Sequence, residues 1–349
     1  MHQESDIRIL FFADSHLGLD YPIRPRIERR RRGQDFFDNF QTVLDHAEQR
    51  RMDLVIHGGD LFFRSRVPAR IVDLVYQQLL EFAKHGIPIY IVPGNHERSR
   101  LPPSLLLNHP GISVFDRPKT FLLRKEEKTL SLSGFPFVRK NIRQDFKSIV
   151  SETGWDAVPA DARLLCMHQA VEGAEVGPVN YRFRYGSEVI RFSDLPADCL
   201  AVLSGHIHRK QVLTAETENG KTTLIYPGSI ERTSFAEKDE RKGFFEIVVG
   251  PRPDSDAWHM KRLEFIELPS RPMVDVLLDP KIKPWDLGTH IRSQLAGLDD
   301  DSIVRFKCIK TVGHPFDGIL TSAFLREVMP ASMNFQLSID FRTAKRTER

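Results

Sequence analysis

Five short apolar segments of the sequence are each followed directly by polar residues of the types that bind metal ions. These polar groups are Asp14-Ser15-His16, His57-Gly58-Gly59-Asp60, Asn95-His96-Glu97, His168 and Ser204-Gly205-His206-Ile207-His208. Asp14 and His16 are two residues apart, so an extended backbone would point both side chains to one side. His206 and His208 have the same spacing. Mixed nitrogen and oxygen donors suit Mn²⁺ or a similar first-row ion, so we predict a site for a pair of divalent cations.

Such a pair of cations indicates hydrolysis of a phosphoester. Two divalent ions about 3.5–4 Å apart lower the pKa of a water molecule and bind the non-bridging oxygens of the substrate. A histidine beside them can protonate the leaving oxygen. Each motif alone is weak evidence, because Asp-Xaa-His is common on surfaces and a single histidine such as His168 is more often part of a core. The occurrence of all five groups at the ends of apolar segments favours the catalytic interpretation.

Strands and helices alternate over the first 210 residues, which predicts an α/β fold with substantial parallel pairing. Helical spacing of apolar residues covers 36–47, and a second helix is expected from Pro68 to Gly86. The expected strands are 7–13, 53–57, 87–92, 130–134, 163–167 and 199–203. Ligands of open α/β sheets bind beyond the carboxyl ends of the strands, so we expect the five polar groups to converge there.

A second, smaller domain is expected after a proline-containing break at 268–272. Hairpin-like strands at 211–217, 222–226 and 243–249 precede the break. Beyond it the pattern predicts a strand at 273–278, a helix at 284–298, a strand at 303–312, a helix at 318–328 and a strand at 334–341. We therefore predict a domain over 1–268, a small α+β domain over 269–341 and a basic tail over 342–349.

Composition excludes several classes of protein. The chain has 349 residues, a formal net charge of +3 and three cysteines, so neither a disulfide framework nor a cysteine-built zinc site is expected. No apolar stretch is long enough to span a membrane, and we expect a cytoplasmic protein. Six of the nine residues from Arg24 to Arg32 are arginines. This cluster is either a solvated surface or a contact for a polyanion.

Together these motifs resemble the calcineurin-like metallophosphoesterase superfamily. Within it the chain is most similar to the SbcD family of DNA repair nucleases, on softer features such as Asp14-Ser15-His16-Leu17-Gly18 and Tyr226-Pro227-Gly228-Ser229. The resemblance implies a sandwich of two mixed β-sheets flanked by helices, with a small C-terminal α+β cap domain. It also implies a Mn²⁺-dependent 3′-to-5′ exonuclease and single-strand endonuclease that acts in double-strand-break repair or recombination.

The resemblance also implies a role for each site residue. One metal would be held by Asp14, His16 and His208, and the other by Asn95, His168 and His206. Asp60 would bridge the two metals, and His96 would be the catalytic histidine. The chain departs from several family members at Phe63, where they have a histidine. That difference leaves the role of this position open.

The substrate is less strongly specified than the reaction. Arg29, Arg30, Arg31 and Arg32, together with Tyr181, Arg182 and Arg184, are candidate DNA contacts, because basic and aromatic residues grip phosphates and stack on bases. A small-molecule phosphodiesterase or phosphomonoesterase and a non-catalytic DNA-end tether remain alternatives. The resemblance further implies DNA, a homodimer through the region around 101–107 and an SbcC-type ATPase as partners, with no membrane.

Overall fold

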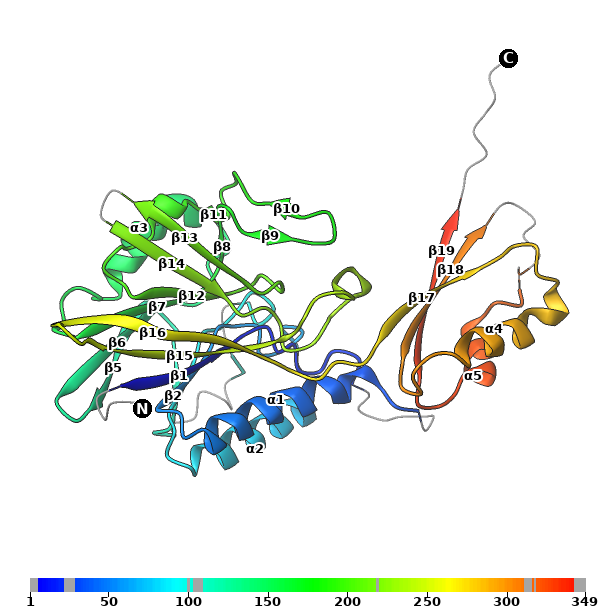
Figure 1. Cartoon of the computed structure of the whole chain (residues 1–349), viewed down its shortest axis with the longest axis horizontal. Coiled ribbons are helices and arrows are strands. Elements are labelled where there is room, and N and C mark those ends of the chain that lie inside the picture. The colour runs from blue at the N-terminus through cyan, green and yellow to red at the C-terminus, as the bar shows by residue number, and fades with distance from the viewer. Residues whose placement is uncertain are drawn as a thin grey trace, which may run out of the picture. The chain divides into compact units, whose positions relative to one another are not determined.

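The computed structural model describes residues 6–21, 29–98, 101–102, 109–217, 220–310, 316 and 318–341. The chain divides into two compact units (Figure 1). The first comprises Met1–Leu19, Asp35–Thr233 and Glu240–Pro269, and the second comprises Asp20–Gln34, Ser234–Asp239 and Ser270–Arg349. Arg24, Arg26, most of the segment 101–107 and the tail 342–349, all singled out from the sequence, lie outside the described residues.

Two six-stranded sheets form the first unit (Figure 1). The first sheet contains β1 Ile7–Phe12, β2 Leu54–His57, β3 Ile89–Ile91, β4 Ile112–Val114, β15 Gly243–Arg252 and β16 Ser255–Glu267, in the order β16-β15-β1-β2-β3-β4. The second contains β5 Lys119–Lys125, β6 Lys128–Gly134, β7 Ala162–His168, β12 Ala201–Gly205, β13 Gln211–Thr217 and β14 Gly220–Tyr226, in the order β13-β14-β12-β7-β6-β5. β1 to β4 are parallel, and so are β6, β7, β12 and β14. The carboxyl ends of these parallel strands therefore lie at one edge of each sheet.

Alternating side chains place the main core between the two sheets. Ile7, Ile9 and Phe11 of β1 are fully buried in that core together with residues of the second sheet. Phe12 faces the other way, and its ring lies 5.8 Å from that of Phe40 in α1 (Arg32–Gln49). The other helices of this unit are α2 (Ala69–Ala83) and α3 (Ile142–Glu152), and the latter packs on the second sheet. The predicted mixed α/β fold of two large sheets flanked by helices is confirmed.

Three of the differences between this unit and the sequence-based expectation concern β15, β16 and α3. β13 and β14 form the expected hairpin, but β15 leaves them and pairs with β1 and β16 in the other sheet. β16 has 13 residues and was missed, because its many polar side chains leave no apolar run. The short helix α3 was also missed, since its buried face contributes only Ile142, Phe146 and Val150. The place of β15 depends on pairing between segments that are distant in the sequence, and a local sequence pattern does not encode such pairing.

The second unit contains a three-stranded sheet in which every pair of neighbours is parallel. Its strands are β17 Met273–Leu278, β18 Ile303–Lys310 and β19 Asn334–Phe341, and its helices are α4 Leu287–Leu295 and α5 Ser322–Val328. Both helices contribute to one apolar core with this sheet. α5 begins four residues later than expected, because the Thr321 hydroxyl caps it by accepting the Phe324 N–H at 3.2 Å.

Arg29 holds the end of α5 within this second unit. Its guanidinium donates to the carbonyl oxygens of Pro330, Met333, Arg326 and Met329 at 2.6–3.1 Å. The last carbonyls of a helix have no partner within the helix, so these bonds satisfy groups that would otherwise need water. The sequence indicated Arg29 as a candidate DNA contact. In the structure, both of its terminal nitrogens instead donate to backbone carbonyl oxygens of its own unit.

We expect Arg29→Ala to lower the free energy of unfolding by about 2–3 kcal/mol, because four carbonyl oxygens lose a charged donor. Arg30→Ala is the matched control, since Arg30 makes an exposed ion pair with Asp301 at 3.3 Å, a kind of pair worth at most about 1 kcal/mol. Urea unfolding followed by circular dichroism measures both. Equal effects of the two substitutions would show that Arg29 is not a structural support.

Candidate metal centre and active site

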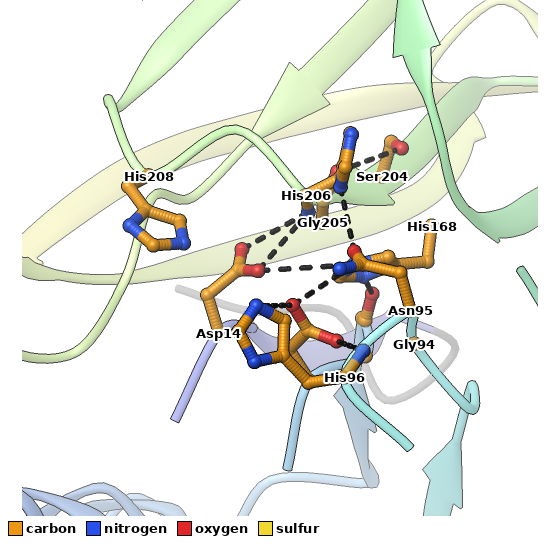
Figure 2. A network of polar contacts seen from close by, with 12 residues as sticks. Asp14, Gly94, Asn95, His96, His168, Ser204, Gly205, His206 and His208 are labelled. Atoms are coloured by element: carbon orange, nitrogen blue, oxygen red, sulfur yellow. Dashed lines mark hydrogen bonds and ion pairs between the residues drawn. The ribbon is translucent and has the colours of Figure 1, made fainter. Parts of the chain in front are cut away.

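The polar groups at the strand ends meet at one place in the first unit (Figure 2). Asp14 follows β1, Asp60 follows β2, Asn95 and His96 follow β3, His168 ends β7, and His206 and His208 follow β12. Asn95 lies centrally, because its side-chain oxygen is 2.8 Å from His206 Nδ1 and 3.0 Å from His168 Nε2. The structure thus brings side chains from both sheets to one point.

Three overlapping groups of these side chains could each hold a cation. They are Asp14, His16 and His208; His16, Asp60 and His96; and Asp14, Asp60 and His168; within each group the possible ligand atoms lie within 4.8 Å of one another. The Nε2 atoms of His16 and His208 are 2.9 Å apart. Asp14, His16 and Asp60 each belong to two of these groups, so the groups share side chains and lie next to one another.

The backbone at these positions adopts a conformation that residues other than glycine rarely take. The φ angle is +52° at Asp14, +43° at His16, +53° at Asp60 and +83° at His206. The Asp14 N–H donates to Gly59 O at 2.8 Å, and the His16 N–H donates to Asp60 O at 3.0 Å. These hydrogen bonds stabilise the strained turns, which are typical of functional sites.

Close packing explains the glycine that precedes Asp60. A Cβ atom added at Gly59 would lie 2.2 Å from His168 Nδ1. Any larger residue would therefore displace the His168 ring from the centre. Glycine is required here to let the end of β2 approach the end of β7, the contact that joins the two sheets at this edge.

Charge pairing inside the centre shifts the pKa values of Asp60 and His168 in opposite directions. Burial opposes the ionised forms, but His168 lowers the pKa of Asp60 below its usual range. In return, Asp60 raises the pKa of His168 to about 9 against the effect of burial. The two groups lie 3.4 Å apart, from His168 Nε2 to Asp60 Oδ2. His168 Nδ1 donates to Gly58 O at 2.8 Å, which directs Nε2 into the centre.

The donor set fits divalent cations. It combines two buried carboxylates, one amide oxygen and imidazole nitrogens, without a cysteine. His168 Nε2 faces carboxylate and amide oxygens, so a cation there would replace the proton that Asp60 now stabilises. Asp14, His16, His208 and Asp60 would hold one ion, and Asp60, Asn95, His168 and His206 would hold the other. Bound there, the ions would supply Lewis acidity for phosphoester hydrolysis.

His57 and Ser204 support the turns around the centre through hydrogen bonds. Burial lowers the pKa of His57 to about 3, so its ring is neutral. Its Nδ1 accepts the Gly59 N–H at 3.2 Å, and Nε2 therefore donates to Ser15 Oγ at 2.9 Å. Ser204 Oγ binds the backbone of Gln169 beside His168. His57 and Ser204 thus fix the turns that carry the ligands.

Glu97 connects the two loops that carry Asp60 and Asn95. Its carboxylate accepts the Phe62 N–H at 2.6 Å and the Gly94 N–H at 2.8 Å. Burial and the nearby Asp60 raise the pKa of Glu97 to about 8. The side chain is buried, so its role is to hold the loops together.

His96 is held so that one ring nitrogen remains directed at the centre. Its Nδ1 donates to Phe63 O at 2.5 Å, while Nε2 lies 3.8 Å from Asp60 Oδ2. Its side chain is 34% exposed, whereas Asp14, His16, Asp60 and His168 are buried, so a substrate can reach it. Phe63, the residue that departs from the family pattern, thus positions His96 through its carbonyl. Its ring lies 5.8 Å from the ring of His96.

The candidate DNA-contact residues lie in two places. Arg29, Arg30, Arg31 and Arg32 belong to the second unit, and Arg31 forms an ion pair with Asp20. Tyr181 and Arg182 form the short strand β10 (Tyr181–Arg182), paired with β9 (Glu175–Val176) in the first unit, and Arg184 follows. Tyr181 is 57% exposed. The metal-ligand group contains neither of these sets.

Sequence reasoning missed part of the surroundings of the centre. A hollow of about 840 Å³ adjoins Asn95, His96 and His206, and it is also lined by Ser65, Arg98, Phe137, Arg139 and Glu188. Phe137 and Arg139 come shortly after β6, another parallel strand of the second sheet. The signal that could have found them is their place shortly after this strand, the kind of position from which the metal ligands were predicted.

The sequence model of the calcineurin-like phosphoesterases matches residues 7–210. The chain belongs to this family. In its members, phosphoester hydrolysis is the shared reaction, and the matched region includes every proposed metal ligand and His96. Hydrolysis of phosphoesters with divalent metals is therefore the activity of this chain.

Three curated relatives are similar over most of the chain. The DNA double-strand break repair protein Mre11 of Methanococcus maripaludis is 25% identical over 79% of this chain and 70% of its own length. Mre11 of Archaeoglobus fulgidus is 27% identical over 78% of this chain and 62% of its own length. The SbcD subunit of the SbcCD nuclease of Bacillus subtilis is 26% identical over 72% of this chain and 68% of its own length.

None of the helices in the described part of the chain is both long and apolar enough to cross a membrane.

We expect Asp60→Asn to weaken Mn²⁺ binding at least 100-fold, because the charge at the shared ligand position is lost while the acceptor for the His96 N–H is kept (2.8 Å to Oδ1). Calorimetric titration of the purified protein measures the affinity. Asp275→Asn is the control, because it removes a carboxylate of lowered pKa from the second unit. Unchanged affinity in Asp60→Asn would exclude Asp60 as a ligand.

Proposed function

We propose that this protein is a Mn²⁺-dependent DNA nuclease with 3′-to-5′ exonuclease and single-strand endonuclease activity, which acts in DNA double-strand-break repair or recombination inside the cell. The observation that carries the proposal is the convergence of two carboxylates, Asn95 and four histidines beside the partly exposed His96. The names of the relatives, break repair proteins and a nuclease subunit, support DNA as the substrate.

In the proposed reaction His96 acts on the leaving group. The Nδ1 proton is committed to Phe63 O, so Nε2 is the atom that can carry a second proton toward the substrate. A phosphodiester leaves as a poor alkoxide, and a proton from Nε2 would stabilise the departing oxygen. The bound cations would neutralise the phosphate. The carboxylates and histidines around them fix where that phosphate lies.

The hairpin of β9 and β10 is proposed to contact DNA beside the centre. Arg209, next to the proposed ligand His208, donates to Gly177 O and to Asn180 Oδ1, both at 2.7 Å. This arginine ties the turn of the hairpin to the metal-binding loop. Tyr185, 83% exposed, offers a surface for base stacking, as does Tyr181. Arg182, which bonds Glu175 at 3.0 Å, and Arg184 would bind the backbone phosphates.

The arginines of the second unit are proposed as a separate, sequence-independent contact. Arg30 and Arg31 have half-exposed side chains in surface ion pairs, which a DNA phosphate could replace. Arg32 adjoins them at the start of α1, and Arg29 would contribute through its charge alone, since its donors are used by carbonyl oxygens. These contacts would weaken with rising salt concentration.

We also propose that the chain works in a larger assembly. The relative from Bacillus subtilis is named as a subunit of the SbcCD nuclease, which supports an SbcC-type ATPase as partner. A homodimer is proposed from the family resemblance alone. Size measurements of the purified protein with and without such an ATPase would test both the homodimer and the complex with the ATPase. A protein that stays monomeric would refute the homodimer, and one that does not bind the ATPase would refute the complex.

We expect His96→Asn to bind Mn²⁺ as wild type does and to lose at least 100-fold in kcat, because the ligands remain while the proton donor is removed. The assay uses end-labelled hairpin and single-stranded DNA with Mn²⁺, with metal binding followed by calorimetry. His259→Asn, in β16, is the matched control.

The same assay with wild-type protein separates the three functions under consideration. Cleavage of DNA supports the proposed nuclease. Hydrolysis of bis-p-nitrophenyl phosphate without DNA cleavage would instead favour a small-molecule phosphodiesterase. DNA binding without hydrolysis of either substrate would favour a DNA-end tether. Full activity of His96→Asn would refute the role of His96.

We expect the double substitution Tyr181→Ala and Tyr185→Ala to raise the KM for single-stranded DNA about 10-fold, because stacking on a base contributes roughly 1–3 kcal/mol. The corresponding phenylalanine variants keep the rings and should retain the wild-type KM. Hydrolysis of bis-p-nitrophenyl phosphate should not change in either protein. An unaltered KM for DNA in the alanine variant would remove the hairpin from the DNA-binding surface.

A further inference from the structure

The hollow beside the metal centre is lined in part by residues that the proposed chemistry does not use. Asn95, His96 and His206 form its inner wall, and Ser65, Arg98, Phe137, Arg139 and Glu188 form the rest. All of them belong to the first unit. Its volume of about 840 Å³ lies in the range of sites that hold a small organic ligand. The hollow is therefore large enough for a piece of the substrate beyond the phosphate.

Phe137 gives this hollow an aromatic wall in a fixed position. Its ring centroid lies 5.6 Å from that of His206 and 6.0 Å from that of His168, so it packs against the ligands of one proposed ion. The backbone around it is held on both sides, because the Phe137 N–H donates to Pro93 O at 2.9 Å and Gln169 Nε2 donates to Val138 O at 3.2 Å. A half-buried ring held in this way is suited to stacking on a flat partner.

Two arginines give the same hollow a positive wall. Arg98 and Arg139 are both exposed, and neither makes an ion pair with any residue that the structure describes. Glu188 is the one acidic side chain among the lining residues outside the metal centre. Two guanidinium groups against one carboxylate favour an anion, and the planar donors of arginine match the oxygens of a phosphate.

The position of His96 indicates which part of the substrate occupies the hollow. His96 lines the hollow, and under the proposed function its Nε2 serves the leaving oxygen. The nucleotide attached to that oxygen must therefore extend from His96. On the side of the hollow away from the metal centre, the wall formed by Phe137, Arg98 and Arg139 combines an aromatic ring with two cations.

We propose that this hollow binds the nucleotide on the leaving-group side of the cleaved bond, with its base stacked on Phe137 and its next phosphate bound by Arg98 and Arg139. The inference rests on the proposed nuclease function. It assigns to these three residues the selection of a substrate that carries a base at this position. These three residues therefore differ in role from the metal ligands, which act on the scissile phosphate alone.

The test uses single-stranded oligonucleotides in which one nucleotide beside a defined cleavage site is replaced by an abasic residue, on one side or the other. For the wild-type protein, loss of the base on the leaving-group side should raise KM about 10- to 100-fold, the size expected for one stacked base. Loss of the base on the other side should have a smaller effect. Bis-p-nitrophenyl phosphate reports the metal centre without this nucleotide.

Phe137→Leu should raise the KM for the unmodified strand as much as the abasic residue raises it for the wild-type protein. In this variant, the abasic residue should cause no further rise in KM. Phe137→Tyr keeps the ring and should behave as wild type. Arg98→Gln and Arg139→Gln should each raise KM for DNA and reduce its dependence on salt, whereas Arg252→Gln, an exposed arginine at the end of β15, should do neither. All five proteins should hydrolyse bis-p-nitrophenyl phosphate at the wild-type rate.

An equal abasic penalty in Phe137→Leu and wild type would overturn the inference, as would no penalty in wild type. A parallel loss of small-ester hydrolysis in Phe137→Leu would also overturn it, because the ring would then support the metal centre instead. These failures leave DNA cleavage intact. Absence of DNA cleavage by the wild-type protein would overturn the proposed function itself, so the two failures are distinguishable.

Discussion

A single buried negative charge, the carboxylate of Asp60, organises the centre. The side chain is 2% exposed, and a charge so far from water is costly unless it is compensated. His168 at 3.4 Å supplies most of that compensation, and His96 and His16 add to it. Asp60 Oδ1 also accepts the backbone N–H of His96. The same side chain therefore connects the proposed metal ligands to the proposed proton donor.

The packing of the two sheets sets the distance between the halves of the centre. Asp14 and Asp60 extend from β1 and β2 of the first sheet, whereas His168 and His206 extend from β7 and β12 of the second. The core between the sheets is filled by fully buried side chains, so the sheets cannot approach or separate without loss of packing. The strained turns at the strand ends then set the directions of the side chains that enter the centre. The apolar core thus fixes the positions of the polar side chains that the two sheets carry.

The sequence was sufficient to predict which polar side chains lie close together, because an apolar run followed by Asp, Asn or His marks the ends of β1, β2, β3, β7 and β12. Local pattern could not give the pairing of β15 with β1, which joins residues more than two hundred positions apart. It gave no hint that the Phe63 carbonyl orients His96, because a backbone group is the same in every residue. Composition also treats Arg29 and Arg30 alike, yet one donates to four backbone carbonyls and the other makes a surface ion pair.

The second unit is assembled from three separate stretches of the chain. Phe235 packs with Met273 and Ile303, and the Arg305 guanidinium lies 4.5 Å above its ring. A gene fragment that starts at Ser270 would therefore lack both Phe235 and Arg29. A single cut in the chain therefore cannot separate this unit intact from the catalytic sheets.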